Sequence, residues 1–558
     1  MDADLLSIQE ARDAVATASK AQKRFKTATQ DEVDRVVAAM VEAGAGEARR
    51  LGQLAHDETG FGKPESKEQK NLFATRTLAD RMAGMRTAGI VGKSDDGKVW
   101  TVATPMGVVG ALVPSTNPTA TAFYKAIIAA KARCGIVMSP HPRAVRCTSE
   151  ALRVVAEAAY AAGAPEGLFA CLGQTAAGVT LAGTDALLEH PQTDVILATG
   201  GGAMVRAAYS KGKPAYGVGS GNVPAYVDRS ANVDKAAADV LTGTSFDWGT
   251  LCSTERSVVA DAPIRQRLLD ALRQRGGHVC SDDETTRLRA IIKPGGRFNT
   301  DLVGQSPRRI AEMAGFSVPE GTRALVAPVE AVGPGEPLSM ETLSPILSFY
   351  VADGWEAGCE RCLEILEFGG IGHTLALHAT SDRVIERFAL EKPSMRIVVN
   401  TVAALGSVGM TTDLFPSMTL GPGAVGGSIT SDNVTPLHLV NLKRVAFETT
   451  PLNTDGGEPV EPGARTSRPA PRSATPRSAA PRPTGGPRRA PGGDGSWMDE
   501  IEARLVARAG NPGAPPAPRA TPTAHATNHA AGSEKPPTSS VLPLPDAQIE
   551  SLVSRFRK

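Results

Sequence analysis

The chain has 558 residues, with 60 Lys+Arg against 59 Asp+Glu and 41% hydrophobic residues. This length predicts more than one domain, and the near-zero net charge excludes the basic excess that nucleic-acid binding requires. No run of about 18 apolar residues occurs, so we expect no membrane span. The acidic start lacks the features of a secretion signal, and seven cysteines, an odd number, argue against a disulfide framework. We therefore expect a cytoplasmic enzyme.

Helical stretches alternate with β-rich runs through the first 450 residues. Residues 5–58 predict two or three amphipathic helices. The runs that follow predict strands at 108–114, 135–139, 195–198, 225–228 and 257–260, separated by helical segments such as 119–132 and 149–162. This order indicates an α/β fold with parallel sheets covered on both faces. Ligands of such sheets bind beyond the carboxyl ends of the strands, so the loops there are the first candidates for a site.

Cys252 lies in a turn of small and hydroxyl-bearing residues, 244-TSFDWGTLCSTERSVVA-260, just before a predicted strand. Such a turn offers backbone N–H groups that stabilise a thiolate, the form in which cysteine acts as a nucleophile. The alternative is a buried structural cysteine, which is the commoner use of a free thiol.

Two further loops follow predicted strands. In the first, Asn117 comes before a predicted helix, where its amide points into the cleft or merely caps the helix. In the second, His141 and Arg143 carry positive charge that suits an anionic cofactor, although alone they would be typical of a surface loop.

Glycines mark two more turns. The strand at 195–198 runs into a glycine-rich turn at 199–202 and a helix, where the backbone can approach a cofactor closely and the helix N-terminus favours phosphate. The patch at 217–222 is also glycine-rich and contains no acidic residue.

Together these segments resemble the aldehyde dehydrogenase superfamily, and within it the coenzyme-A-acylating branch. The motifs that carry the resemblance are TNPT at 116–119, SPHPRA at 139–144, LATGG at 197–201, GKPAYGVGSGN at 212–222, CSTE at 252–255, METLSPIL at 340–347, GHTLALHA at 372–379 and SDNVTPLHLVNLKRVA at 431–446. The similarity covers nearly all of 5–446 and leaves the C-terminal tail out.

The resemblance implies NAD as cofactor and coenzyme A as cosubstrate. It makes Cys252 the nucleophile and makes Asn117 and the Cys252 backbone N–H the holders of the oxyanion. Glu341 would bind the nicotinamide ribose, and 199–201 would hold the nicotinamide. The cofactor-binding residues it implies are Pro114, Ser115, Thr116, Ser139, His141, Pro142, Thr199, Gly200, Gly201, Gly217, Gly219 and Glu341.

The resemblance also divides the chain. Residues 1–225 would form an NAD-binding domain and 226–400 a catalytic domain with Cys252. Residues 401–449 would complete the body and serve oligomerisation, as a homodimer or homotetramer.

The absence of a glutamate at 217–222 indicates which molecule accepts the acyl group. Hydrolytic relatives carry a glutamate in the segment that matches 217–222, where it activates water to release the acid. Without this base the acyl-enzyme persists, and the thiol of coenzyme A can take the acyl group by thioester exchange. We expect oxidation of a short aldehyde to acyl-CoA, with propionaldehyde favoured and acetaldehyde second, and Trp248 narrowing the aldehyde pocket. The alternatives are a hydrolytic aldehyde dehydrogenase, a non-catalytic scaffold that recruits partners through its tail, and an acyl-phosphate reductase.

The C-terminal tail has a different composition, with 19 of the 41 prolines at 451–545. It predicts a disordered linker over 450–544 with a short helical island at 497–508. Residues 545–558 predict an amphipathic helix, which resembles the targeting helices of bacterial microcompartment enzymes and would bind a shell or cargo protein, with 497–508 as the second candidate. The alternative is a low-complexity extension without a partner. No metal motif is present, so we expect no metal.

Overall fold

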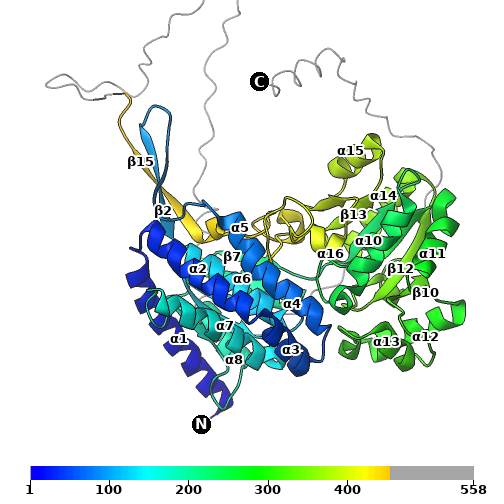
Figure 1. The fold of residues 1–558 in the computed structure, drawn as a ribbon, viewed down its shortest axis with the longest axis horizontal. Coiled ribbons are helices and arrows are strands. Elements are labelled where there is room, and N and C mark those ends of the chain that lie inside the picture. Colours follow the sequence, from blue (N-terminus) through cyan, green and yellow to red (C-terminus); the bar gives the residue numbers. More distant parts are fainter. Residues whose placement is uncertain (1, 451, 453–558) are drawn as a thin grey trace, which may run out of the picture. The chain divides into compact units, whose positions relative to one another are not determined.

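The computed structural model describes residues 2–450 and 452 (Figure 1). The predicted helical island at 497–508, the predicted helix at 545–558 and nearly all of the predicted linker lie outside the described residues. None of the described helices is both long enough and apolar enough to cross a membrane.

The first sheet has five parallel strands in the order β5-β4-β3-β6-β7. Their bounds are β3 Val108–Val113, β4 Gly135–Pro140, β5 Phe169–Cys171, β6 Val195–Thr199 and β7 Ala215–Val218. The helices that alternate with them are α6 Pro118–Lys131, α7 Val145–Ala161, α8 Leu181–Glu189 and α9 Gly202–Tyr209. β3 is buried along its whole length, and alternate side chains enter two separate hydrophobic cores, one with α6 and α7 and the other with α1 and α8.

The order of these strands creates a crevice. The chain moves outward from β3 through β4 to β5, then returns to the opposite side of β3 for β6 and β7. The loops after β3 and β6 therefore diverge from neighbouring strands, which is where an open parallel sheet binds its ligand.

The second sheet has seven parallel strands in the order β10-β11-β12-β9-β8-β13-β14. Their bounds are β8 Val223–Val227, β9 Glu255–Asp261, β10 Gly277–Val279, β11 Ala324–Pro328, β12 Ile346–Ala352, β13 Leu375–His378 and β14 Ile397–Val399. Helices α10 Val233–Ser245 and α11 Arg265–Gln274 share the core on one face. The other face is covered by α12 Asp282–Ile292, α13 Pro307–Met313, α14 Gly354–Phe368 and α15 Asp382–Glu391; α16 is Ala403–Gly406.

Five helices precede the sheets: α1 Ala3–Phe25, α2 Gln30–Gly46, α3 Ala48–Thr59, α4 Pro64–Leu72 and α5 Leu78–Met82. α2 begins with a capping box in which Thr29 and Glu32 satisfy each other's backbone N–H groups. A third, antiparallel sheet joins distant parts of the chain in the order β1-β2-β15, with β1 Gly89–Lys93, β2 Val99–Pro105 and β15 Val440–Ala446. In Figure 1 the three strands extend away from the helices.

The predicted α/β fold with parallel sheets is confirmed. The five predicted strands correspond to β3, β4, β6, β8 and β9, and the helices predicted at 119–132 and 149–162 to α6 and α7. The sequence reasoning did not predict the antiparallel sheet or the strands β5, β7, β10, β11, β12 and β14. The domain boundaries at 225, 400 and 449 stay predictions.

Candidate active site

A cavity of about 570 Å³ lies where the two parallel sheets approach each other. The five-stranded sheet contributes the carboxyl ends of β3, β4 and β6. The seven-stranded sheet contributes segments that come before its strands, with Cys252 preceding β9 and Glu341 preceding β12. The cavity thus lies between the carboxyl edge of the five-stranded sheet and the amino edge of the seven-stranded sheet. The expectation that ligands bind beyond the carboxyl ends of strands therefore identifies only the first of these two walls.

Most residues named from the sequence line this cavity. They are Pro114, Ser115, Thr116, Asn117, His141, Thr199, Gly200, Gly201, Gly219, Cys252 and Glu341. Three others lie outside the lining: Ser139 is buried and hydrogen-bonds Thr184 across 2.8 Å, Pro142 begins a short 3-10 helix, and Gly217 is buried in β7.

The Cys252 side chain is half-buried at the cavity wall, and all seven cysteines are free. Burial raises the pKa of its thiol to about 12, the negative charge of Glu341 raises it further, and Arg396 and Arg256 oppose these effects. In the protein without ligands the thiol is therefore protonated at neutral pH, and forming the nucleophile requires removal of a proton.

This environment predicts how Cys252 reacts with an alkylating reagent. Because the thiolate is the reactive form, the alkylation rate of Cys252 should rise about tenfold per pH unit from pH 8 to pH 9.5 without levelling, and less steeply around pH 7, where Glu341 ionises. Burial raises the pKa of Glu341 to about 7, so its charge is present at pH 9 and largely absent at pH 6. Glu341→Gln should therefore accelerate alkylation about three- to tenfold at pH 9 and little at pH 6. The alkylation rate is measured by peptide mass spectrometry. A rate that levels off below pH 8 would contradict the raised pKa of the Cys252 thiol.

Asn117 occupies the N-cap position of α6, but its side chain makes no capping hydrogen bond. Instead Nδ2 donates to the carbonyl oxygen of Thr250 at 3.1 Å and to the hydroxyl of Thr116 at 3.1 Å. The side chain thus links the loop after β3 to the loop that carries Cys252, so it does not serve as a simple helix cap. A developing oxyanion would have to replace one of these two acceptors, because the NH2 group has two N–H donors.

Glu341 is the sole carboxylate among the lining residues, all of which belong to the described part of the chain. Its Oε1 accepts a hydrogen bond from the backbone N–H of Gly221 at 3.1 Å, and Arg256 partly offsets the effect of burial on its pKa. The loop 217–222 contributes Val218, Gly219 and Ser220 to the wall and no acid.

The wall that sequence reasoning missed is mostly apolar. Leu343 comes from the motif at 340–347, and loops without a recognisable pattern contribute Phe61, Phe298, Val303, Val408, Met418 and Leu420. The expectation that Trp248 narrows the pocket is wrong, since its ring lies outside the lining and stacks under Lys63 Nζ at 4.3 Å. Asp247 and Trp248 both have positive φ, which turns the chain sharply before Cys252 and directs the indole away.

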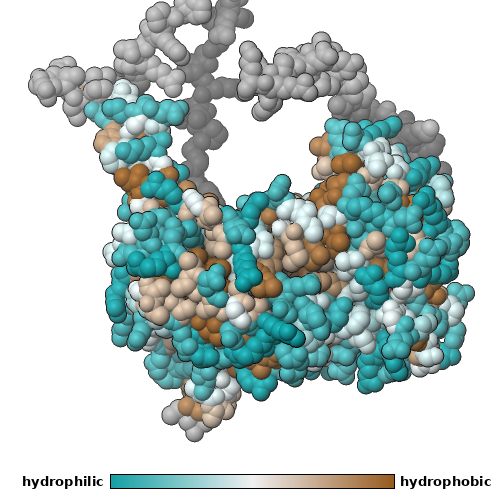
Figure 2. All heavy atoms as spheres, in the orientation of Figure 1, coloured by the Kyte–Doolittle hydropathy of each residue, from teal (hydrophilic) through white to brown (hydrophobic). Residues whose placement is uncertain are grey.

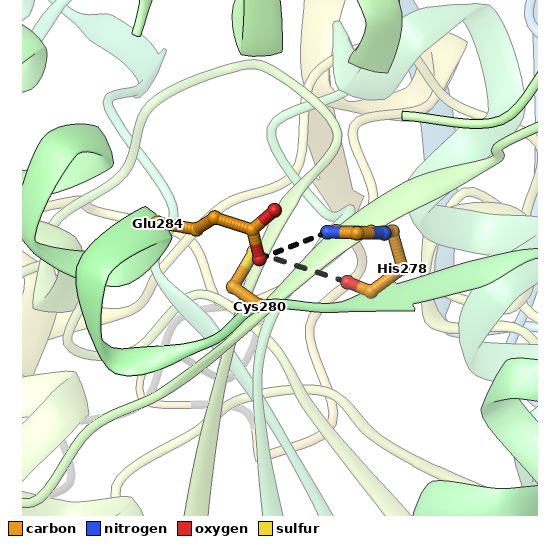
Figure 3. A group of neighbouring side chains, drawn as sticks. All are labelled: His278, Cys280 and Glu284. Atoms are coloured by element: carbon orange, nitrogen blue, oxygen red, sulfur yellow. Dashed lines mark hydrogen bonds and ion pairs between the residues drawn. The ribbon is translucent and has the colours of Figure 1, made fainter. Parts of the chain in front are cut away.

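Within the described residues, one group of side chains has metal-ligand atoms within 4.8 Å of one another: His278, Cys280 and Glu284 (Figure 3). Glu284 accepts the backbone N–H of Ser281 at 2.8 Å in the capping box of α12 and contacts His278 Nε2 at 3.1 Å. Burial raises the pKa of Cys280 to about 12, which disfavours the thiolate that a metal needs. We infer that these side chains stabilise the start of α12. The absence of a metal stays a prediction.

The model of the aldehyde dehydrogenase family matches residues 3–294, about half of the chain, and the chain belongs to this family. It is 39% identical over 449 residues to the bifunctional aldehyde-alcohol dehydrogenase of Escherichia coli, an alignment covering 79% of this chain and 50% of that protein. The chain thus spans about half the length of the first curated relatives it matches.

Solved structures are similar over most of the described residues. An acetylating aldehyde dehydrogenase from Geobacillus thermoglucosidasius has a TM-score of 0.79 and 46% identity, covering 81% of this chain and 100% of its own. Two propionaldehyde dehydrogenases have TM-scores of 0.70. One, from a fucose utilisation microcompartment of Clostridium phytofermentans, is 25% identical over 78% of this chain and 97% of its own. The other, from Rhodopseudomonas palustris with bound CoA and an acylated cysteine, is 26% identical with the same coverage.

Proposed function

We propose that this chain is a CoA-acylating, NAD-dependent aldehyde dehydrogenase that converts an aldehyde, NAD+ and coenzyme A to acyl-CoA, NADH and a proton. The observation that carries the proposal is that Cys252 and Asn117 line one cavity although they lie 135 positions apart in the chain. The acetylating and propionaldehyde dehydrogenases of similar structure support it.

Cys252 and Asn117 have different roles in the proposed reaction. The sulfur of Cys252 bonds to the carbonyl carbon, and its proton must leave for a base or solvent. The negative charge that develops on the carbonyl oxygen is held by Asn117 Nδ2 and the backbone N–H of Cys252. Loss of hydride converts this adduct to a thioester, and the CoA thiol displaces Cys252 by thioester exchange.

NAD fits the carboxyl edge of the first sheet. α9 begins at Gly202 without a side-chain cap, so its first backbone N–H groups remain available to phosphate or carboxamide oxygen. A Cβ built on Gly201 would meet no atom within 4 Å, which shows open space above the turn. Thr199, Gly200 and Gly201 would hold the cofactor, and bound NAD would accept the hydride.

The test of the acceptor is a product balance. With C2 to C5 aldehydes and NAD, acyl-CoA should form in a one-to-one ratio with NADH, and free acid should be below about a tenth of the product. Without CoA, NADH should stop near one equivalent per active site, because the thioester has no acceptor. Continued release of acid at the full rate without CoA would contradict the acylating function.

Hydrolytic oxidation is the second candidate, and Glu341 is the observation that favours it. A carboxylate of pKa about 7 beside Cys252 is suited to activate water. Under this alternative, Glu341→Gln would abolish acid release. Under the acylating proposal, where Glu341 binds the cofactor ribose, the same variant should raise the KM for NAD and leave the ratio of acyl-CoA to acid unchanged.

Propionaldehyde is the proposed substrate and acetaldehyde the second choice, and we place the enzyme in a bacterial microcompartment. The similarity to the propionaldehyde dehydrogenase of such a compartment supports both assignments. Residues 545–558 would bind the shell. Deleting them should leave turnover unchanged and abolish co-sedimentation with shells, and loss of turnover would refute a purely targeting role.

The antiparallel sheet is the proposed oligomer contact. Large apolar side chains are exposed on it, namely Ile90, Val99, Leu442 and Val445. Figure 2 shows hydrophobic residues among hydrophilic ones where the antiparallel sheet meets the rest of the protein. A dimer or tetramer in sedimentation equilibrium, converted to monomer by Leu442→Asp, would support the assignment, and an unchanged assembly would contradict it.

A further inference from the structure

Two buried lysines of α4 reach the loops that form the cavity. Lys67 and Lys70 lie one turn apart, and both are 2% exposed. Neither lines the cavity, so both act from behind its wall. Buried ammonium groups are costly unless they are paired and hydrogen-bonded, so their partners define their role.

Asp247 is the anion that both lysines share. Its Oδ2 forms an ion pair with Lys70 and another with Lys67 at 3.1 Å, and it accepts the hydroxyl of Thr250 at 2.6 Å. Its Oδ1 accepts the backbone N–H of Lys63 at 2.6 Å, and a Cβ on Gly62 would collide with this oxygen at 2.0 Å. Although burial alone would raise the pKa of Asp247, the two lysines lower it below its ordinary value. Two cations and one anion leave this group with an excess of one positive charge.

The two lysines differ in their contacts beyond Asp247, and Lys70 alone also donates to the hydroxyl of Thr250, at 3.4 Å. Lys70 Nζ also donates to Oδ1 of Asn117, whereas Lys67 Nζ donates to the backbone carbonyl of Thr116 at 3.2 Å. Since an ammonium is a donor only, it fixes the amide of Asn117 with its oxygen toward α4. The NH2 group must then face the loop that carries Cys252, as its bond to the Thr250 carbonyl shows.

We propose that Lys70 is a positioning residue for the oxyanion site: it holds Asn117 by its amide oxygen, so that the NH2 group is presented to the substrate oxygen beside Cys252. The bond also polarises the amide and makes its N–H groups stronger donors. Without it, the amide can rotate and place its oxygen where negative charge develops. This inference rests on the proposed function, and it adds a residue outside the cavity to the machinery.

Lys67 provides a matched control. Lys67→Met and Lys70→Met each remove one buried charge and one partner of Asp247. The first also removes the bond to the Thr116 carbonyl, and the second removes the contact with Asn117 and a bond of 3.4 Å to the Thr250 hydroxyl. The readout is the single-turnover rate of NADH formation with propionaldehyde, together with the KM for NAD. Lys70→Met should lower this rate about tenfold or more with little change in KM, and Lys67→Met should lower it less than about threefold.

A double-mutant cycle separates positioning from general damage. Asn117→Ala should cost about 10²–10³-fold, and Lys70→Met/Asn117→Ala should match it within about twofold, because Lys70 acts through Asn117. Equal losses in the two lysine variants, or losses that multiply in the double variant, would overturn the proposal. Should Lys70→Met fail to fold, Lys70→Gln retains an N–H donor without the charge, and the same cycle applies. If the wild-type protein forms no acyl-CoA, the proposed function itself fails.

Discussion

Replacing Cys252 with serine should reduce acyl-CoA formation by at least about 10⁴-fold while leaving the protein folded. A serine hydroxyl is a far weaker nucleophile than a thiolate, and the cavity contains no His among its lining residues besides His141, which follows β4 in the first sheet. The residual rate should be compared with wild type in the same assay of NADH and acyl-CoA, with CoA at saturation.

Cys171→Ser provides the control for this variant. Cys171 is also half-buried, but it ends β5 and accepts a hydrogen bond from the Ser149 hydroxyl at 3.3 Å, outside the cavity. Its replacement should leave turnover within about twofold. If Cys252→Ser kept more than about 1% of activity, another group would be the nucleophile.

Gly221→Ala should reduce activity about 100-fold through a purely steric effect. A Cβ at this position would lie 2.1 Å from the carbonyl oxygen of Cys252 and 3.2 Å from its carbonyl carbon. Both atoms belong to backbone, which cannot swing aside as a flexible side chain does, so the Cys252 loop must move. A shift of this size in a catalytic group is enough to cost about two orders of magnitude in rate.

The matched control is Gly369→Ala, in which the nearest atoms to the new Cβ all belong to the Asn222 side chain and lie at 3.5 Å or more, an ordinary contact distance. It should retain nearly full activity. Gly221→Ala should also lower the free energy of unfolding by about 1–3 kcal/mol, measured by urea titration. Wild-type activity in Gly221→Ala would show that the Cys252 loop tolerates displacement.

The parts of the fold that sequence reasoning found are those in which burial dominates. β3 and β6 are buried on both faces, so their runs of Val, Leu and Ile stand out from the helices on either side. β15 was not predicted because six of its seven residues are exposed, among them Lys443 and Arg444, so it has no buried apolar run. Its strand geometry depends on pairing with β2, more than 300 residues earlier in the chain, which no local pattern records.

The candidate site divides in the same way. Cys252, Asn117 and Glu341 were found because each lies in a motif of a known family, and the structure brings them to one cavity. Lys70 was not found, because the run 67-KEQK-70 is typical of an exposed helix surface. Its burial depends on Asp247, a residue 177 positions away that adopts positive φ before the Cys252 turn. Such a pairing exists only in three dimensions.

The measurement that tests the central claim most directly is mass spectrometry of protein quenched during turnover with propionaldehyde and NAD but without CoA. The peptide that contains Cys252 should carry a propionyl adduct, and the other six cysteines should not. Adding CoA before the quench should remove the adduct and yield propionyl-CoA in equal amount. An unmodified Cys252 in protein that has released an equivalent of NADH would contradict the account.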